Sequence, residues 1–312
     1  MNKSSALPAA GDWQSRARAV ARGIRLRVFE HTITHNGGYL SQACSTAELL
    51  AALYTHILKL GPSIAPAVPA PFPGVPGATN TGYFTGVGYN GPKSPELDRF
   101  FISPVHYALV LYATLVETGR MAPDGLAQFN KDGSTVEMIG AEHSPGHELT
   151  AGSLGQCLSQ AAGIALARRL KGETGRVWVF MSDGEFQSGQ TWETLHVLAH
   201  HKLDNVGVYV DVNAQQCDGR MADIMAIDPL ARKIEDFGAC VREVDGHDLQ
   251  ALAGAAQKSD GQPLIVLART NPWQGIEILK ERLPKLHYVR FKNEEERARY
   301  RVAFEAMKKG AE

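Results

Sequence analysis

Short runs of apolar residues alternate with segments of helical periodicity through the second half of the chain. Runs such as VWVF at 177–180 are too short for a helix and are typical of buried strands. Strands that alternate with helices predict an α/β fold, in which a parallel sheet has helices on both faces. We expect strands at 177–181, 206–211, 240–244 and 263–269, and helices at 191–201, 229–237 and 247–257.

The first half of the chain is predicted to be mainly helical. Residues 12–35 carry apolar side chains at helical spacing, and a second helix is expected to begin at Ser45, with Glu48 completing a capping box. Gly155 and Gly163 are eight residues apart, a spacing that fits a tight helix contact. The other expected elements are a strand followed by a helix over 98–120, a helix over 153–171 and a charged terminal helix over 292–310.

One long segment, residues 61–92, is too rich in proline and glycine for a helix or a central strand. A loop of this length either covers an active site or a partner, or is a tolerated surface insertion. The sequence contains neither an internal repeat nor an obvious interdomain linker. We therefore expect residues 1–312 to form a single domain, with a C-terminal extension from about residue 270.

Composition and charge narrow the function classes. Hydrophobic residues make up 44% of the chain and charged residues 21%, and 32 basic residues nearly balance 33 acidic ones. This balance gives no reason to expect nucleic acid or an anionic membrane as a partner. The four cysteines are scattered without a CxxC pair, and the first 20 residues lack the apolar core of a signal peptide. A cytoplasmic protein is expected.

Polar residues follow two of the predicted strands. Asp183 and Gly184 follow the strand at 177–181, and Asn213 follows the strand at 206–211. Ligands of open parallel sheets bind outside the carboxyl ends of strands, where these residues could meet. Carboxylate and amide oxygens suit Mg²⁺, and the amides that open the helix after Gly184 favour an anion. A single Asp-Gly pair is also an ordinary turn, so the pairing of two strand ends carries the prediction.

The same residues carry a family resemblance. SDGE, followed 30 residues after Asp183 by Asn213, resembles the signature of proteins that bind thiamine diphosphate. Three further blocks, in order, resemble segments from the amino-terminal half of transketolases: NGGYLSQACSTAELLAALY, DRFFISPVHYALVLYATL and SPGHELTAGSLGQCLSQAAGIALA. The chain is therefore similar to the diphosphate-binding module of that family over nearly its whole length.

The resemblance implies roles for individual residues. Asp183 and Asn213 would hold Mg²⁺ (or Ca²⁺ or Mn²⁺) through their side chains, and Gln215 through its main-chain carbonyl. Gly184 would give an amide to the diphosphate of thiamine diphosphate. The remaining residues matched to the cofactor are Gly152, Leu154 near the thiazolium ring, His106 at the diphosphate, and Cys217, which either faces the thiazolium or is a small buried residue.

The chain also departs from the family pattern. Tyr39 replaces a histidine, and Ser188 replaces a glutamate that links active sites. The family's substrate histidine falls near Ile139, so His143 either compensates from another loop position or is an exposed loop residue. His287 matches a family histidine close to the diphosphate and the substrate. His106, His143 and His287 are therefore the candidate catalytic residues.

The resemblance also implies a partner. A full transketolase is about twice as long, and its second half supplies the glutamate that activates the cofactor. We expect a separate C-terminal, pyrimidine-binding subunit in an α₂β₂ assembly that transfers a two-carbon ketol unit between a ketose and an aldose, with sugar phosphates as the expected substrates. The alternatives are a thiamine diphosphate-dependent 2-oxo-acid decarboxylase or dehydrogenase component, an acyl or ketol transferase of specialised metabolism, and a non-catalytic protein that kept the fold.

Overall fold

The computed structural model describes residues 12–150 and 152–310. Its centre is a five-stranded sheet in the order β1-β2-β3-β7-β6, in which every neighbouring pair is parallel. The start of the chain, for which no signal peptide is expected, lies outside these residues. The strands are β1 (Arg99–Ile102), β2 (Val177–Ser182), β3 (Val206–Val212), β6 (Cys240–Asp245) and β7 (Leu264–Arg269).

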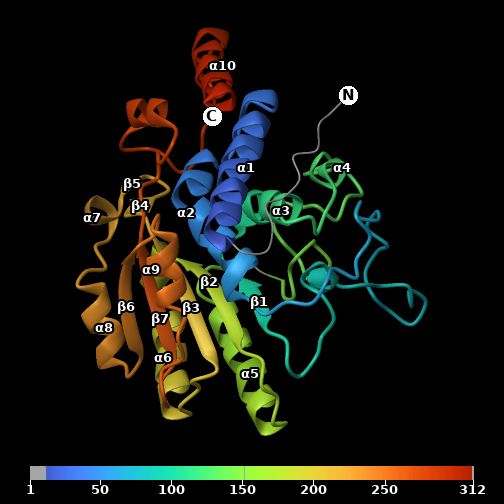
Figure 1. Cartoon of the computed structure of the whole chain (residues 1–312), viewed down its shortest axis with the longest axis vertical. Coiled ribbons are helices and arrows are strands. Elements are labelled where there is room, and N and C mark those ends of the chain that lie inside the picture. Colours follow the sequence, from blue (N-terminus) through green and yellow to red (C-terminus); the bar gives the residue numbers. More distant parts are fainter. Residues whose placement is uncertain (1–11, 151, 311–312) are drawn as a thin grey trace.

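Helices cover both faces of this sheet (Figure 1). On one face pack α1 (Trp13–Thr34), α2 (Leu40–Ala52), α3 (Ala108–Glu117) and α9 (Leu249–Gly254), with α10 (Glu294–Lys309) packed on α1. On the other face pack α5 (Cys157–Leu170), α6 (Gly189–His200) and α8 (Leu230–Asp236). The predicted α/β fold class is confirmed.

Alternation along the strands explains why two cores form. In β2, Trp178 and Phe180 face the α1 side, whereas Val177 and Val179 face the α5 side. All six residues of β2 and all seven of β3 are buried, as expected for central parallel strands. Further short elements include α4 (Pro123–Leu126), α7 (Met221–Ile224) and a hairpin of β4 (Gln215–Gln216) and β5 (Gly219–Arg220).

The expected beginning of the second helix is wrong. The helix begins at Leu40, five residues before Ser45, and Ser45 is buried inside it. Its hydroxyl donates to Asp211 at 2.7 Å instead of capping the helix. Ser41 and Gln42 lie in the first turn of this helix, and their side chains donate to the main-chain carbonyls of Leu286 at 2.8 Å and His287 at 3.1 Å.

The expected contact through Gly155 and Gly163 is also wrong. Gly155 precedes α5 and has a positive φ of 80°, and a Cβ there would meet Ser188 at about 2.6 Å. A Cβ on Gly163 would meet nothing within 4 Å. Gly155 therefore serves a turn, and Gly163 faces open space on α5.

The proline-rich segment 61–92 is tied to the rest of the chain by main-chain hydrogen bonds. The amide of Phe72 donates to Gly133 at 2.8 Å, and the amide of Ala122 donates to Ala67 at 2.7 Å. A short 3₁₀ turn, η2 (Gly86–Asn90), closes the segment. None of the helices in the described part of the chain is long and apolar enough to cross a membrane.

Candidate functional site

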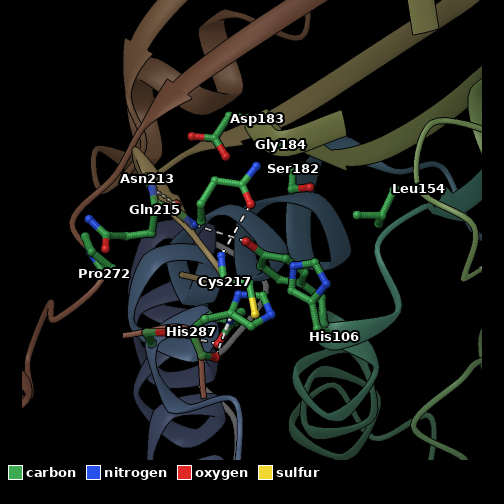
Figure 2. A pocket seen from close by; sticks show the side chains of 14 residues that line it. His106, Leu154, Ser182, Asp183, Gly184, Asn213, Gln215, Cys217, Pro272 and His287 are labelled. Carbon is green, nitrogen blue, oxygen red and sulfur yellow. Dashed lines mark hydrogen bonds between the residues drawn. The ribbon is translucent and has the colours of Figure 1, made fainter. Parts of the chain in front are cut away.

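A pocket lies at the carboxyl ends of β2, β3 and β7, with a cavity volume of about 140 Å³. Figure 2 shows Asp183 and Gly184 on one side of it, with Cys217, His106 and His287 across from them. Eight of the ten residues selected from the sequence line this pocket: His106, Leu154, Asp183, Gly184, Asn213, Gln215, Cys217 and His287.

Parallel pairing of β2 and β3 places the two polar strand ends together. Ser182 is in register with Asp211, so the residues that follow leave the sheet side by side. Asp183 begins a 3₁₀ turn, η4 (Asp183–Gln187), and its carboxylate accepts a hydrogen bond from the amide of Ala214 at 2.9 Å. A Cβ on Gly184 would lie 3.4 Å from the side-chain amide of Gln216, so glycine leaves space beside the carboxylate.

Asp183 and Glu185 belong to the same turn but have different environments. Asp183 faces the pocket, and burial and the nearby Asp211 raise its pKa to about 8. Glu185 is fully buried, and its carboxylate accepts from the main-chain amides of Ser182 at 2.9 Å and Gly155 at 3.0 Å and from the hydroxyl of Ser103. Glu185 thus joins the ends of β1 and β2 to the turn before α5, and only Asp183 is available to a ligand.

The donor set fits a hard cation bound to a diphosphate. Asp183 and Asp211 are buried carboxylates close enough to raise the pKa of Asp183, a repulsion that a cation would relieve. The side-chain oxygen of Gln215 is buried without a hydrogen-bond partner among the described residues. Within the same residues, no group of three or more His, Cys, Asp or Glu is placed to hold a metal ion, so amide and carbonyl oxygens would have to complete the coordination.

Two histidines from distant parts of the chain meet at the pocket. His106 comes from the turn η3 (Val105–Tyr107), and its ring lies 4.8 Å from that of His287, near the C-terminal end. Burial, and secondarily His287, lowers the pKa of His106 to about 3, and burial also lowers the pKa of His287. Both imidazoles are therefore neutral near pH 7, so each can donate one hydrogen bond and accept another.

Tyr39 lies beside both histidines, in the position where the sequence departs from the family. Its ring is 5.9 Å from that of His106, 5.5 Å from that of His287 and 4.9 Å from that of Tyr288. The main chain of Gly38 pairs with Val289, which holds the C-terminal segment against the beginning of α2. The pocket edge therefore combines residues from both ends of the chain.

Two selected residues do not line the pocket. The ring of His143 lies against that of Phe72, tilted by 37° with ring centroids 4.6 Å apart, and its Nε2 lies 3.3 Å from Glu137. Gly152, with φ of 127°, precedes the pocket residue Leu154, and a Cβ on it would meet Ile139. His143 is thus held by the 61–92 segment, and with a side chain only 12% exposed it is neither a pocket residue nor the exposed loop residue of the alternative.

Several pocket residues were not selected from the sequence, namely Ser41, Gln42, Tyr107, Ser182, Gln216 and Pro272. Most adjoin a recognised block, and Tyr107 directly follows His106. Pro272 carries no recognisable motif. It reaches the pocket because β7 lies beside β3 in the sheet.

Comparison with known proteins identifies the family. Residues 84–278 match the family model described as transketolase, thiamine diphosphate binding domain. The chain is 35% identical to a transketolase family protein of Sinorhizobium fredii, over 88% of this chain and 90% of that protein. The chain belongs to the transketolase family. The family predicted from the sequence is confirmed, and so is a thiamine diphosphate-binding domain.

Two further comparisons show how the length of this transketolase chain relates to that of similar proteins. It is 29% identical to one subunit of the apulose-4-phosphate transketolase of Actinobacillus succinogenes, over 88% of this chain and 90% of that relative. A solved transketolase from Pichia stipitis shares the fold, with a TM-score of 0.67 and 21% identity. That alignment covers 94% of this chain and 44% of the other, so the chain spans less than half of the solved transketolase.

Proposed function

We propose that this chain is the thiamine diphosphate- and Mg²⁺-binding subunit of a transketolase divided between two chains. With its partner it would transfer a two-carbon ketol unit from a ketose to an aldose. The observation that carries the proposal is the juxtaposition of Asp183, Gly184 and Asn213 at the carboxyl ends of β2 and β3, beside the paired histidines.

The dimensions of the pocket support a shared active site. Pockets that hold a whole small molecule usually measure about 300–1,000 Å³. The cavity of about 140 Å³ in this chain is large enough for only part of a cofactor. A relative of nearly the same length is named as one subunit of a transketolase. These facts favour a separate subunit that covers the pyrimidine end of the cofactor, in an α₂β₂ assembly.

Each residue of the pocket would have a defined task. Asp183, the side-chain oxygen of Asn213 and the main-chain carbonyl of Gln215 would hold the cation, and Gly184 would let the diphosphate approach the main chain. When bound, thiamine diphosphate would supply the electron sink that this chemistry requires. His106 and His287 would orient phosphate or hydroxyl oxygens through hydrogen bonds.

Titration calorimetry with thiamine diphosphate and Mg²⁺ tests the proposal. We expect Mg²⁺-dependent binding to the wild-type chain, and loss of that binding in Asp183→Ala. The matched control is Asp236→Ala, on the exposed surface of α8, which should bind as the wild type does. Unchanged binding by Asp183→Ala would contradict the proposed site, and transferase turnover by the single chain would contradict the need for a partner.

A further inference from the structure

A second buried carboxylate, Asp211, lies at the end of β3, two residues before Asn213. Four groups donate to it: the hydroxyls of Ser45 at 2.7 Å, of Tyr107 at 2.6 Å and of Thr270, and the side-chain amide nitrogen of Asn213 at 2.9 Å. The donors come from α2, the turn η3 and the residues after β3 and β7. Asp211 thus joins four segments of the chain at this end of the pocket.

These contacts leave the Asn213 amide one orientation. Its nitrogen donates to Asp211 and, at 3.2 Å, to the phenol oxygen of Tyr107, while its oxygen accepts from the amide of Gln215 at 2.9 Å. An ionised carboxylate only accepts hydrogen bonds. If the amide turned over, its oxygen would face the Asp211 carboxylate and its NH₂ would face the Gln215 N–H, so both hydrogen bonds would be lost.

We propose that Asp211, assisted by Tyr107, is a positioning residue that fixes the side-chain oxygen of Asn213 for the cation. The inference rests on the proposed function, in which that oxygen is a cation ligand. An amide oxygen has two acceptor sites, and the Gln215 N–H occupies one. The second acceptor site stays available to the cation only while the amide nitrogen is held on the side of Asp211.

A purely structural role explains the carboxylate poorly. Burying a charged group is costly, and Asp211 pairs in register with Ser182, next to the buried carboxylate of Asp183, so like charges would repel there. A neutral asparagine at 211 could still accept from hydroxyl groups without that repulsion. It could also present an NH₂ group to the oxygen of Asn213 and so permit the wrong orientation. The carboxylate of Asp211 has no N–H group to donate, so it excludes the wrong orientation of Asn213.

A double-mutant cycle tests the inference, with Mg²⁺ affinity measured by calorimetry in the presence of thiamine diphosphate and Mn²⁺ binding measured by electron paramagnetic resonance. Asp211→Asn removes no proposed ligand, yet should weaken cation binding about 10- to 100-fold, the usual effect of losing a partner that orients a ligand. In the Asn213→Asp background, the residue at 213 offers oxygen in both orientations. There, Asp211→Asn should weaken binding by less than about threefold, because the residue at 213 presents an oxygen to the cation whichever way it turns.

Ser45→Ala is the matched control, because it removes one hydrogen bond to Asp211 but leaves both partners of the Asn213 amide nitrogen in place. It should lower the unfolding temperature and change cation affinity less than about threefold. If Asp211→Asn does not fold, Tyr107→Phe takes its place and should weaken cation binding only when Asn213 is present.

Two results would overturn the inference: equal weakening by Asp211→Asn in both backgrounds, or equal weakening by Ser45→Ala and Asp211→Asn. A wild-type chain that binds neither Mg²⁺ nor thiamine diphosphate, alone or with its partner subunit, would instead overturn the proposed function. The two failures are therefore distinguishable by the wild-type titration alone.

Discussion

The buried carboxylate of Glu185 provides the sharpest test of how this site is supported. One of its oxygens accepts from the Gly155 amide and the Ser103 hydroxyl, and the other from the amide of Ser182. Glu185→Gln keeps the shape of the side chain but replaces one carboxylate oxygen with an NH₂ group. Because both oxygens accept a main-chain amide, either orientation of glutamine leaves one buried N–H without an acceptor.

An unpaired buried amide costs about 1–3 kcal/mol, and the surviving hydrogen bonds lose their charge-assisted character. Burial raises the pKa of Glu185, so a neutral glutamine recovers some desolvation energy. We expect a net loss of about 2 kcal/mol in the free energy of unfolding. The affinity for thiamine diphosphate should fall as well, because the Gly155 amide that adjoins Leu154 is released.

Urea denaturation followed by circular dichroism measures this change. The matched control is Glu193→Gln, the same chemical change at an exposed position of α6, which should alter stability by less than about 0.5 kcal/mol. If Glu185→Gln and Glu193→Gln have the same stability, the carboxylate does not hold the strand ends together and the reasoning is wrong.

Three further predictions concern other parts of the chain. Gly155→Ala should lower stability by at least about 1–3 kcal/mol, because its positive φ and the close Ser188 both exclude a Cβ, whereas Gly163→Ala should raise it by about 0.5–1 kcal/mol, both measured by urea denaturation. Burial lowers the pKa of His147 to about 4, so unfolding takes up a proton at this residue between about pH 6.5 and 4. As the pH falls from 7 to 5, this proton uptake should lower the free energy of unfolding by about 2 kcal/mol. His287→Ala should lower kcat/KM of the assembled enzyme by tenfold or more, and His143→Ala by less than about threefold, because only His287 lines the pocket.

Each of these predictions has an outcome that contradicts it. Equal effects of Gly155→Ala and Gly163→Ala would refute the assigned turn. The pH effect belongs to His147 only if His147→Gln loses about 2 kcal/mol less stability than the wild type between pH 7 and 5, while other buried histidines such as His106 keep the rest of the slope. An equal loss of activity in the two histidine variants would place His143 in the active site despite its contact with Phe72.

The parts of the fold set by nearby residues could be predicted from the sequence. The central strands are continuous apolar runs, and their observed ends lie within one or two residues of those expected. The beginning of α2 could not be predicted, because Ser45 is helical and buried through its bond to Asp211, 166 residues away in sequence. Intrinsic propensity at such a position is outweighed by tertiary contacts.

In the site, too, features set by nearby residues could be predicted and features set by distant contacts could not. Asp183 and Asn213 could be predicted to lie together because each follows a recognisable strand, and adjacent parallel strands bring their ends together. The positioning roles proposed for Asp211 and Tyr107 depend on contacts between segments more than 100 residues apart, which no local spacing reveals. His143 and His287 are both candidates in the sequence. Only the structure distinguishes them, because the C-terminal segment returns to α2 and brings His287, but not His143, to the pocket.

That return of the chain also bears on where the functional unit ends. The last strand of the sheet finishes at Arg269, so a truncation there would leave all five strands of the sheet in place. It would also remove Pro272 and His287 from the pocket wall and Val289 from its pairing with Gly38. A shortened chain of this kind could keep the architecture of the family and still lack part of its binding site. For this protein, the boundary of the sheet and the boundary of the working unit are different positions in the sequence.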